Sequence, residues 1–146
     1  MSIAPKFDAL VIGEVVVDRE LHFTRDRLVR YAGTSGDFNP IHYRDDVAQS
    51  VGLPGVLAHS MLTMGAAASP VLDWLGGQGS VVDYQVRFTR PVPVDADGGA
   101  TVRVTATVGT VDAEAQTARI DLRVVFADQT VLGKSQLVLA FAAHSA

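Results

Sequence analysis

The sequence predicts an α+β fold in which one buried helix is covered by an antiparallel sheet. Residues 60–75, SMLTMGAAASPVLDWL, form an apolar run of helical length. After this run, apolar and polar residues alternate over several segments that polar turns separate, which is typical of consecutive antiparallel strands. One buried helix followed by several such strands favours a sheet wrapped on the helix.

The N-terminal half is more irregular. Residues 10–23, LVIGEVVVDRELHF, are rich in Val and predict one or two short strands. Thr24 can cap a short helix over 25–32, whose apolar residues recur at helical spacing. Residues 33–43 are predicted as loop, and a second short helix over 45–51 should end at the breaker cluster that follows it.

The helix over 60–75 is apolar almost all round, so we expect it to be buried rather than amphipathic. Its small residues at 65–68 would let a sheet pack close, and Pro70 should kink the helix or split it in two. The strand-like segments after it are SVVDYQVRF, TVRVTATVGTV, TARIDLRVVF and TVLGKSQLVLAF.

Composition bounds the class of protein. With 146 residues, we expect a single domain over 1–146 that is long enough for a real core. Hydrophobic residues make up 48% and charged residues 19%, which excludes disorder and fits a subunit that buries surface against another copy or a partner. The absence of cysteine excludes disulfides, thiolate catalysis and Cys-based zinc sites. The start does not resemble a signal peptide, and no apolar run reaches the roughly 18 residues of a membrane span, so we expect a cytoplasmic protein without membrane association.

The net charge of −4 argues against nucleic-acid binding. The arginines nevertheless cluster, with Arg25, Arg27 and Arg30 in one group and Arg87 and Arg90 in another. Such a locally basic rim could receive a phosphate or an acidic partner, or the side chains could be ordinary solvated charges.

The most informative segment is 31–42, YAGTSGDFNPIH. It places a carboxyl group, Asp37, five residues before an imidazole, His42, across a Phe-Asn-Pro bend. Such a bend could aim both side chains at one point, as an acid/base pair requires. The alternative is an Asx turn at Asp37 or Asn39 together with a surface histidine.

Two further segments could contribute to a site. Residues 58–61, Ala-His-Ser-Met, lie where an extended segment meets the start of the apolar helix, and unpaired N–H groups at a helix start suit a developing oxyanion. Alternatively Ser60 is an N-cap and His59 a core or interface histidine. Residues 84–88, YQVRF, could line the same site or form an ordinary amphipathic strand.

Together these segments resemble the MaoC-like hydratase/dehydratase family, which includes R-specific enoyl-thioester hydratases and β-hydroxyacyl dehydratases. The likeness rests on GDFNPIH at 36–42, VLAHS at 56–60 and, further on, LTMG and VRFTRPVPV. It extends over nearly the whole chain and is strongest toward single-domain actinobacterial dehydratases, some of which work as two-subunit pairs.

The resemblance implies a hot-dog fold, a long helix wrapped by a curved antiparallel sheet, that dimerises so that two sheets join. It implies that Asp37 and His42 interconvert a 3-hydroxyacyl thioester and its trans-2-enoyl product, carried on coenzyme A or an acyl carrier protein. It implies neither a metal nor a redox cofactor. The partner would be a second copy of the chain or a related hot-dog subunit.

The residue chemistry supports such a reaction independently. We expect His42 to act as the base at the α carbon and Asp37 to handle the hydroxyl group or water, although the reverse division, or both groups holding one water, stays open. Asn39 would orient the loop or the water, and the backbone N–H near Ser60 would polarise the thioester carbonyl.

Ser60 is a departure from the family pattern, which has Gly after the second histidine. If this position required positive φ, a serine would carry strain of about 1–3 kcal/mol. Its side chain would also intrude on the thioester. We expect Ser60 to narrow or re-polarise the pocket without abolishing catalysis.

The remaining substrate-binding candidates are less specific. His59, Met61 and Met64 could contact the acyl chain, although core packing is the ordinary role of methionines in an apolar helix. Arg87 and Arg90 could meet the phosphates of coenzyme A or an acidic carrier. Two other functions stay open: a partner subunit of a heterodimeric dehydratase, and a secondary-metabolite enzyme acting on a polyketide-like substrate.

Overall fold

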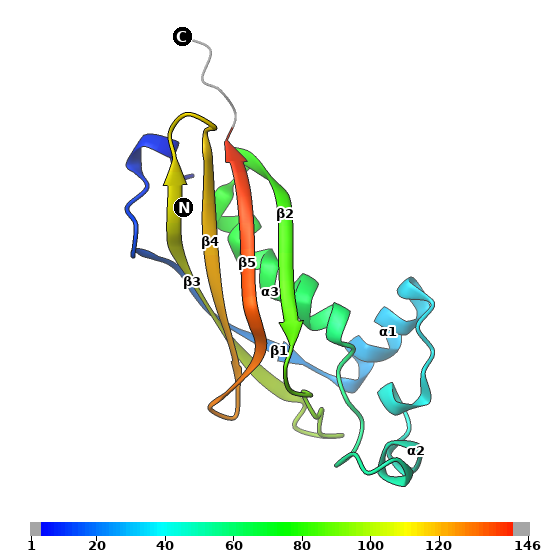
Figure 1. Cartoon of the computed structure of the whole chain (residues 1–146). Helices are drawn as coiled ribbons and strands as arrows, with labels where there is room; N and C mark the ends of the chain where they lie inside the picture. Colours follow the sequence, from blue (N-terminus) through cyan, green and yellow to red (C-terminus); the bar gives the residue numbers. More distant parts are fainter. Residues whose placement is uncertain (1–3, 142–146) are drawn as a thin grey trace.

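The structure, a computed structural model, describes residues 4–141. Its sheet contains five strands in the order β1-β3-β4-β5-β2, and every neighbouring pair is antiparallel. The strands are β1 (Val15–Phe23), β2 (Gly79–Phe88), β3 (Ala100–Asp112), β4 (Thr117–Phe126) and β5 (Gln129–Phe141). Figure 1 shows them as one continuous curved layer. The four strands after α3 coincide with the four alternating segments predicted from the sequence.

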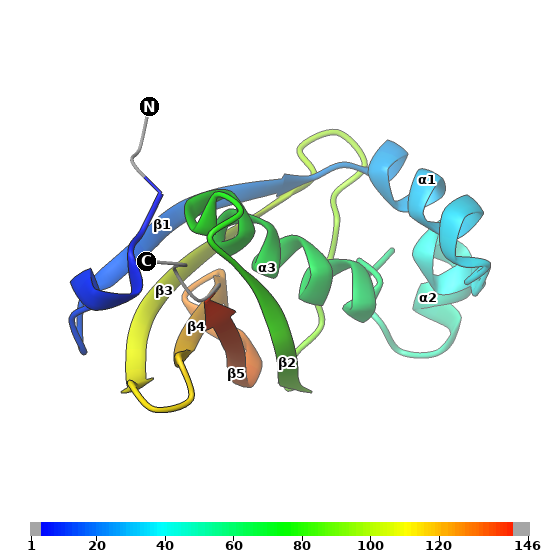
Figure 2. The same ribbon diagram turned by 90° about the horizontal axis from the view of Figure 1, so that it is seen from above.

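The helices lie on one side of this sheet and at its end. The helical segments are η1 (Phe7–Ala9), α1 (Arg25–Ser35), η2 (Pro40–His42), α2 (Asp45–Ser50) and α3 (Ser60–Leu75), where η marks a short 3-10 helix. Seen from above in Figure 2, α3 lies in the concavity of the sheet, while α1 and α2 stand beyond one end of α3. A curved sheet wrapped on one long helix confirms the predicted hot-dog fold.

The core forms between α3 and the inner face of the sheet. Alternate residues of β3 and β4 point inward, and Val102, Val104 and Ile120 are fully buried. From α3, Ala67 and Val71 pack against this layer with no exposed surface. The small side chains of α3 therefore allow the close helix–sheet approach that the sequence predicted.

Four details of the sequence prediction are wrong. The N-terminal strand is confined to 15–23, because residues 7–14 form η1 and an irregular turn. The first helix continues to Ser35, where Gly36 ends it with the left-handed φ of 77° that glycine adopts without strain. The predicted loop also contains η2.

The fourth detail concerns α3, which Pro70 does not split. Proline removes one helical hydrogen bond, yet the helix continues past it to Leu75 with the ring buried. The helix is also exposed along one side, where Met61 and Leu72 are 59% and 48% exposed, so it is not buried all round. Within 4–141, no helix has both the length and the hydropathy required to cross a bilayer.

Candidate functional site

The loop between α1 and α2 holds Asp37 through its own backbone hydrogen bonds. The N–H of Asp37 donates to the Ser35 hydroxyl at 3.1 Å, and Asp37 Oδ1 accepts from the N–H of Asn39 at 3.2 Å. Asn39 Oδ1 in turn accepts from the N–H of Ile41 at 3.2 Å and caps η2. Both Asx turns weighed from the sequence therefore form, and Asn39 orients the loop.

His42 is fixed by a contact on the far side of the site. Its side chain is buried, and Nδ1 lies 2.7 Å from the carbonyl oxygen of Leu57. Because a carbonyl only accepts, Nδ1 carries the proton that it donates there. Nε2 is then the ring nitrogen left for proton transfer, and it lies 3.8 Å from an Asp37 carboxylate oxygen.

The two titratable groups face one another across a short gap. His42 Nε2 lies 3.8 Å from Asp37 Oδ2, and the Asp37 side chain is 51% exposed. This separation is too long for a direct hydrogen bond. A water or hydroxyl oxygen about 2.8 Å from each atom would fit at the apex of the triangle. The structure thus brings Asp37 and His42 within reach of a single bridging oxygen atom.

His59 lies beneath this pair and is almost completely buried. Its ring is stacked on His42 with centroids 3.8 Å apart, and Tyr31 packs against its other side at 4.7 Å. Nε2–H donates to the backbone carbonyl of Asp37 at 3.2 Å, while Nδ1 is buried without a partner. Burial lowers the pKa of His59, and its hydrogen bond to the Asp37 carbonyl opposes that effect. His59 therefore packs against the loop as in the core-histidine alternative weighed from the sequence.

The N-terminus of α3 adjoins the pair without a side-chain cap. His59 is its N-cap and makes no capping hydrogen bond, so Ser60 is the first helical residue and not the cap. The first N–H groups of such a helix have no intrahelical acceptor. Ser60 is absent from the positive-φ residues of the described chain, so the strain considered from the sequence does not arise.

Asp37, His42 and His59 also bring ligand-type atoms within 4.8 Å of one another. Imidazole lone pairs lie in the plane of the ring, and the planes of the two stacked histidines differ by only 24°. Their lone pairs therefore run side by side instead of converging on one ion about 2.1 Å away. The arrangement suits proton transfer better than metal coordination.

Three other predicted residues, Arg90, Met61 and Met64, have different surroundings. Arg90 lies with Ser60 and Thr63 around a narrow crevice, and it also lines an open cavity of about 320 Å³ beside Phe126. Met61 is exposed on the first turn of α3. Met64 is partly buried and accepts a 2.8 Å hydrogen bond from the Tyr84 hydroxyl through its carbonyl.

The two arginine clusters differ in their surroundings. Arg87 is exposed on the face of β2 opposite the inward-pointing Tyr84, so it is not brought to the site. Arg30 pairs with Asp26 within α1, and Arg27 stacks over Phe23. The N-terminal cluster therefore does not form a basic rim on the site.

Sequence reasoning missed two contacts near His42. One is the carbonyl of Leu57, which no side-chain pattern can indicate because every residue has a carbonyl. The other is Asp45, whose ion pair with Arg25 at 2.9 Å ties α1 to α2. The sequence signal for this pair was Arg25 itself, which we interpreted either as part of a basic rim or as an ordinary solvated charge.

Comparisons with known proteins give matches to one family of domains. The family model described as "MaoC like domain" matches residues 8–131. Over 79 residues, the chain is 38% identical to 3-hydroxyacyl-thioester dehydratase X of Mycobacterium tuberculosis, covering 54% of this chain and 27% of that protein. It is 35% identical over 79 residues to the (R)-specific enoyl-CoA hydratase of Rhodospirillum rubrum, covering 53% and 55%.

A solved structure described as a MaoC-like dehydratase superposes with a TM-score of 0.90 at 32% identity. The match covers 95% of this chain and 43% of that one. The chain thus matches between about a quarter and about half of the length of these three relatives.

Proposed function

The chain belongs to the MaoC-like domain family, and on that premise we propose that it reversibly hydrates trans-2-enoyl thioesters to (3R)-3-hydroxyacyl thioesters. One observation carries the proposal: His42 Nε2 lies 3.8 Å from Asp37 Oδ2. The gap can hold the one oxygen atom that the reaction adds or removes. The names of the two relatives from M. tuberculosis and R. rubrum support the same chemistry.

Hydration then begins with Asp37 ionised and His42 protonated. Asp37 takes a proton from water as the water oxygen bonds to C3, and the electron pair of the double bond moves toward the thioester oxygen. His42 Nε2–H gives its proton to C2. The pair ends with the proton on Asp37, and its return to His42 restores the starting state. Dehydration follows the same steps in reverse, with neutral His42 as the base at C2.

The uncapped start of α3 would stabilise the enolate oxygen. Backbone N–H groups at Ser60 and the positive end of the helix dipole suit a developing negative charge. Removal of one comparable donor typically costs about 3–4 kcal/mol of transition-state stabilisation. Because Asp37 and His42 lie close together on one side of the substrate, the hydroxyl group and the proton would be added to the same face.

The thioester carrier would be coenzyme A or an acyl carrier protein. Arg90 is exposed at the mouth of the crevice beside Ser60, where it could meet a phosphate of either carrier. Arg87 faces away from this crevice and is not part of the proposed contact with the carrier.

The protein would act as a dimer, with a second copy or a related hot-dog subunit as its partner. Strand β2 is an edge of the sheet, and Val82 and Phe88 on it are exposed. The exposed side of α3 adds Met61 and Leu72. An open edge with apolar side chains is suited to pairing with another sheet.

Crotonyl-CoA tests the proposed reaction. Wild-type protein should remove the absorbance of the enoyl thioester, while Asp37→Asn and His42→Ala should reduce turnover by at least about 100-fold. His22→Gln is the matched control, because His22 lies on β1 and its side chain bonds to Thr101 on β3. Wild-type turnover that both site variants retain would contradict the roles of Asp37 and His42. No turnover, together with a size shift on mixing with a related subunit, would instead favour the partner-subunit function.

A further inference from the structure

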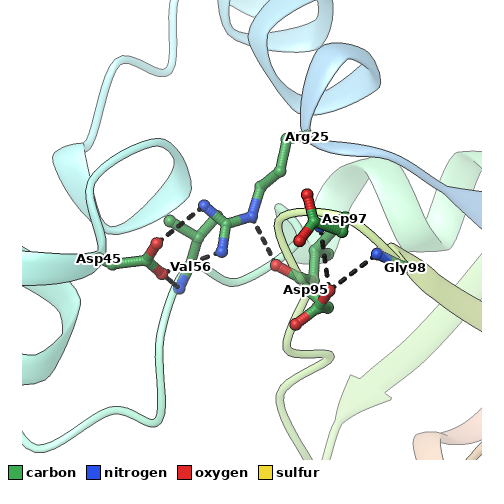
Figure 3. Close-up of polar contacts among 7 residues, drawn as sticks. Arg25, Asp45, Val56, Asp95, Asp97 and Gly98 are labelled. Atoms are coloured by element: carbon green, nitrogen blue, oxygen red, sulfur yellow. Dashed lines mark hydrogen bonds and ion pairs between the residues drawn. The ribbon is translucent and has the colours of Figure 1, made fainter.

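A closed ring of hydrogen bonds joins four segments next to the site. Arg25, the first residue of α1, donates from Nη1 and Nη2 to the two carboxylate oxygens of Asp45 at 3.1 and 2.9 Å. Its Nε donates to the carbonyl of Val94 at 2.5 Å. Figure 3 shows the guanidinium between Asp45 on one side and the segment that carries Asp95 on the other. One side chain thus links α1, α2 and the chain before β3.

Backbone contacts close the ring. Asp45 Oδ1 also accepts from the N–H of Val56 at 2.9 Å, and the carbonyl of Val56 accepts from the N–H of Val94 at 2.9 Å. The Arg25 side chain, and next the Val56 N–H, lower the pKa of Asp45. The carboxylate therefore remains charged, and the ring returns through Val94 to Arg25.

This ring adjoins the two backbone segments that position the His42 imidazole. Leu57 follows Val56 directly, and its carbonyl holds His42 Nδ1 while its N–H donates to Ile41 at 3.1 Å. Asp45 lies three residues after His42 on the same stretch of chain. The ring thus fixes the backbone that carries the imidazole and the backbone that holds its Nδ1.

We propose that the Arg25–Asp45 pair is a positioning device that sets the direction of His42 Nε2 toward Asp37. The inference rests on the proposed function for its kinetic consequence and on geometry alone for its structural one. Arg25 and Asp45 act through Val56 and Leu57, so neither touches the reacting atoms. Misplacement of a reacting group by about 1 Å can reduce the rate about 100-fold.

The chain contains a matched control for this pair. Arg44 and Asp46 form the same two-bonded contact, at 3.1 and 2.5 Å, at the start of the same helix. Both side chains are more than half exposed, and their carboxylate accepts from no distant backbone group in the structure. Loss of this pair removes a comparable ion pair without opening the ring.

Two glycines offer a second comparison, one that leaves all charges in place. A Cβ at Gly55 would lie 2.9 Å from Asp45 Oδ1, so Gly55→Ala should push against the carboxylate within the ring. A Cβ at Gly33, inside α1, would meet nothing within 4 Å. Gly33→Ala makes the same chemical change in open space.

The kinetic test compares kcat and KM for crotonyl-CoA hydration. Arg25→Gln and Asp45→Asn should each lower kcat at least about tenfold while KM changes less than about threefold. Arg25→Lys should restore only part of kcat, because lysine cannot make the two-bonded contact. Arg44→Gln and Asp46→Asn should remain within about twofold of wild type. Equal losses in the two pairs would overturn the proposal.

Nitrogen-15 chemical shifts of His42 test the geometry without turnover. Wild type and the Arg44 and Asp46 variants should show a single state with the Nδ1 proton held at the Leu57 carbonyl, whereas the ring variants should show a mixture of states at Nδ1 and faster exchange of the Leu57 amide. Unchanged shifts and exchange would overturn the proposal even if activity fell. An inactive wild type with these shifts would contradict the proposed function alone. If Arg25→Gln does not fold, the comparison of Gly55→Ala with Gly33→Ala replaces it. The kinetic constants and the His42 chemical shifts are then measured for these two variants.

Discussion

The imidazole of His59 is stacked on that of His42, with ring centroids 3.8 Å apart and planes inclined by 24°. Two protonated rings at this distance would repel one another in a buried setting. His59 is the more buried ring, and its pKa is lowered. The proposed proton therefore belongs on His42, while His59 stays neutral and holds the backbone of Asp37.

This relationship predicts how stability depends on pH. Because the pKa of His59 is lower in the folded protein than its ordinary value of 6.5, the unfolded chain binds the proton first as pH falls. The contribution of His59 to stability is complete above pH 6.5 and is lost progressively below it. Wild-type protein should lose more unfolding free energy than His59→Gln between pH 7 and pH 5 in urea titrations. His22 lies on β1, so the unfolding free energy of His22→Gln should depend on pH as in the wild type. An equal pH dependence in all three proteins would contradict the prediction.

The oxyanion role can be tested at Ser60 by removing one hydrogen-bond donor, the backbone N–H of this residue. Proline is tolerated at the first position of a helix, and His59 before it already has the extended φ and ψ of −60° and 129° that proline requires of its neighbour. Ser60→Pro should therefore fold and yet lose about 100- to 1000-fold in kcat, because the backbone N–H is absent.

Ser60→Gly is the matched variant, since it removes the hydroxymethyl group and keeps the N–H. It should retain kcat within a few-fold in the same assay. A large fall with glycine would show that the hydroxyl group is required. Near-normal turnover with proline would place the oxyanion contact elsewhere.

The exposed edge strand predicts where the chain associates. Val82→Lys places a charge on β2 and should shift the protein toward the monomer in sedimentation velocity experiments. Val29 on α1 has the same exposure, 58% against 59%, and Val29→Lys is the control that should leave the mass unchanged. A dimer that survives Val82→Lys but not Val29→Lys would move the interface to α1.

Helix α1 is predicted to depend on its cap. The hydroxyl of Thr24 accepts from the N–H of Arg27 at 3.2 Å, and replacement of such a cap by alanine costs about 1 kcal/mol. Thr24→Ala should lower the unfolding free energy by about this amount in denaturant titrations. Thr34→Ala, at an exposed hydroxyl within the same helix, should change it by less than about half as much.

The sequence predicted the fold through patterns that repeat, and the site through a motif. Alternation along β3 and β4 identified strands because one face of each is buried. GDFNPIH identified Asp37 and His42 because a bend between two titratable groups is an unusual local signal. Met61 and Leu72 were expected inside because hydropathy does not distinguish the core from an exposed apolar surface.

Contacts between distant segments had no comparable signal. The hydrogen bond from His42 to Leu57 joins residues 15 apart and uses a backbone carbonyl. Arg25 reaches Val94, which is 69 residues away. Such contacts depend on the relative placement of whole elements, which is a property of the folded chain.

The strand order also constrains how the chain reaches its native state. Strand β2 follows α3 directly in the sequence but pairs with β5, the last strand, more than 40 residues later. During synthesis β2 therefore has no partner within this chain until 129–141 have emerged, and the apolar side of α3 is only partly covered until then. Contacts that close such long loops form slowly, and the uncovered strand is vulnerable to aggregation in the meantime. Because α3 carries Ser60, we expect the proposed oxyanion contact to form late in folding.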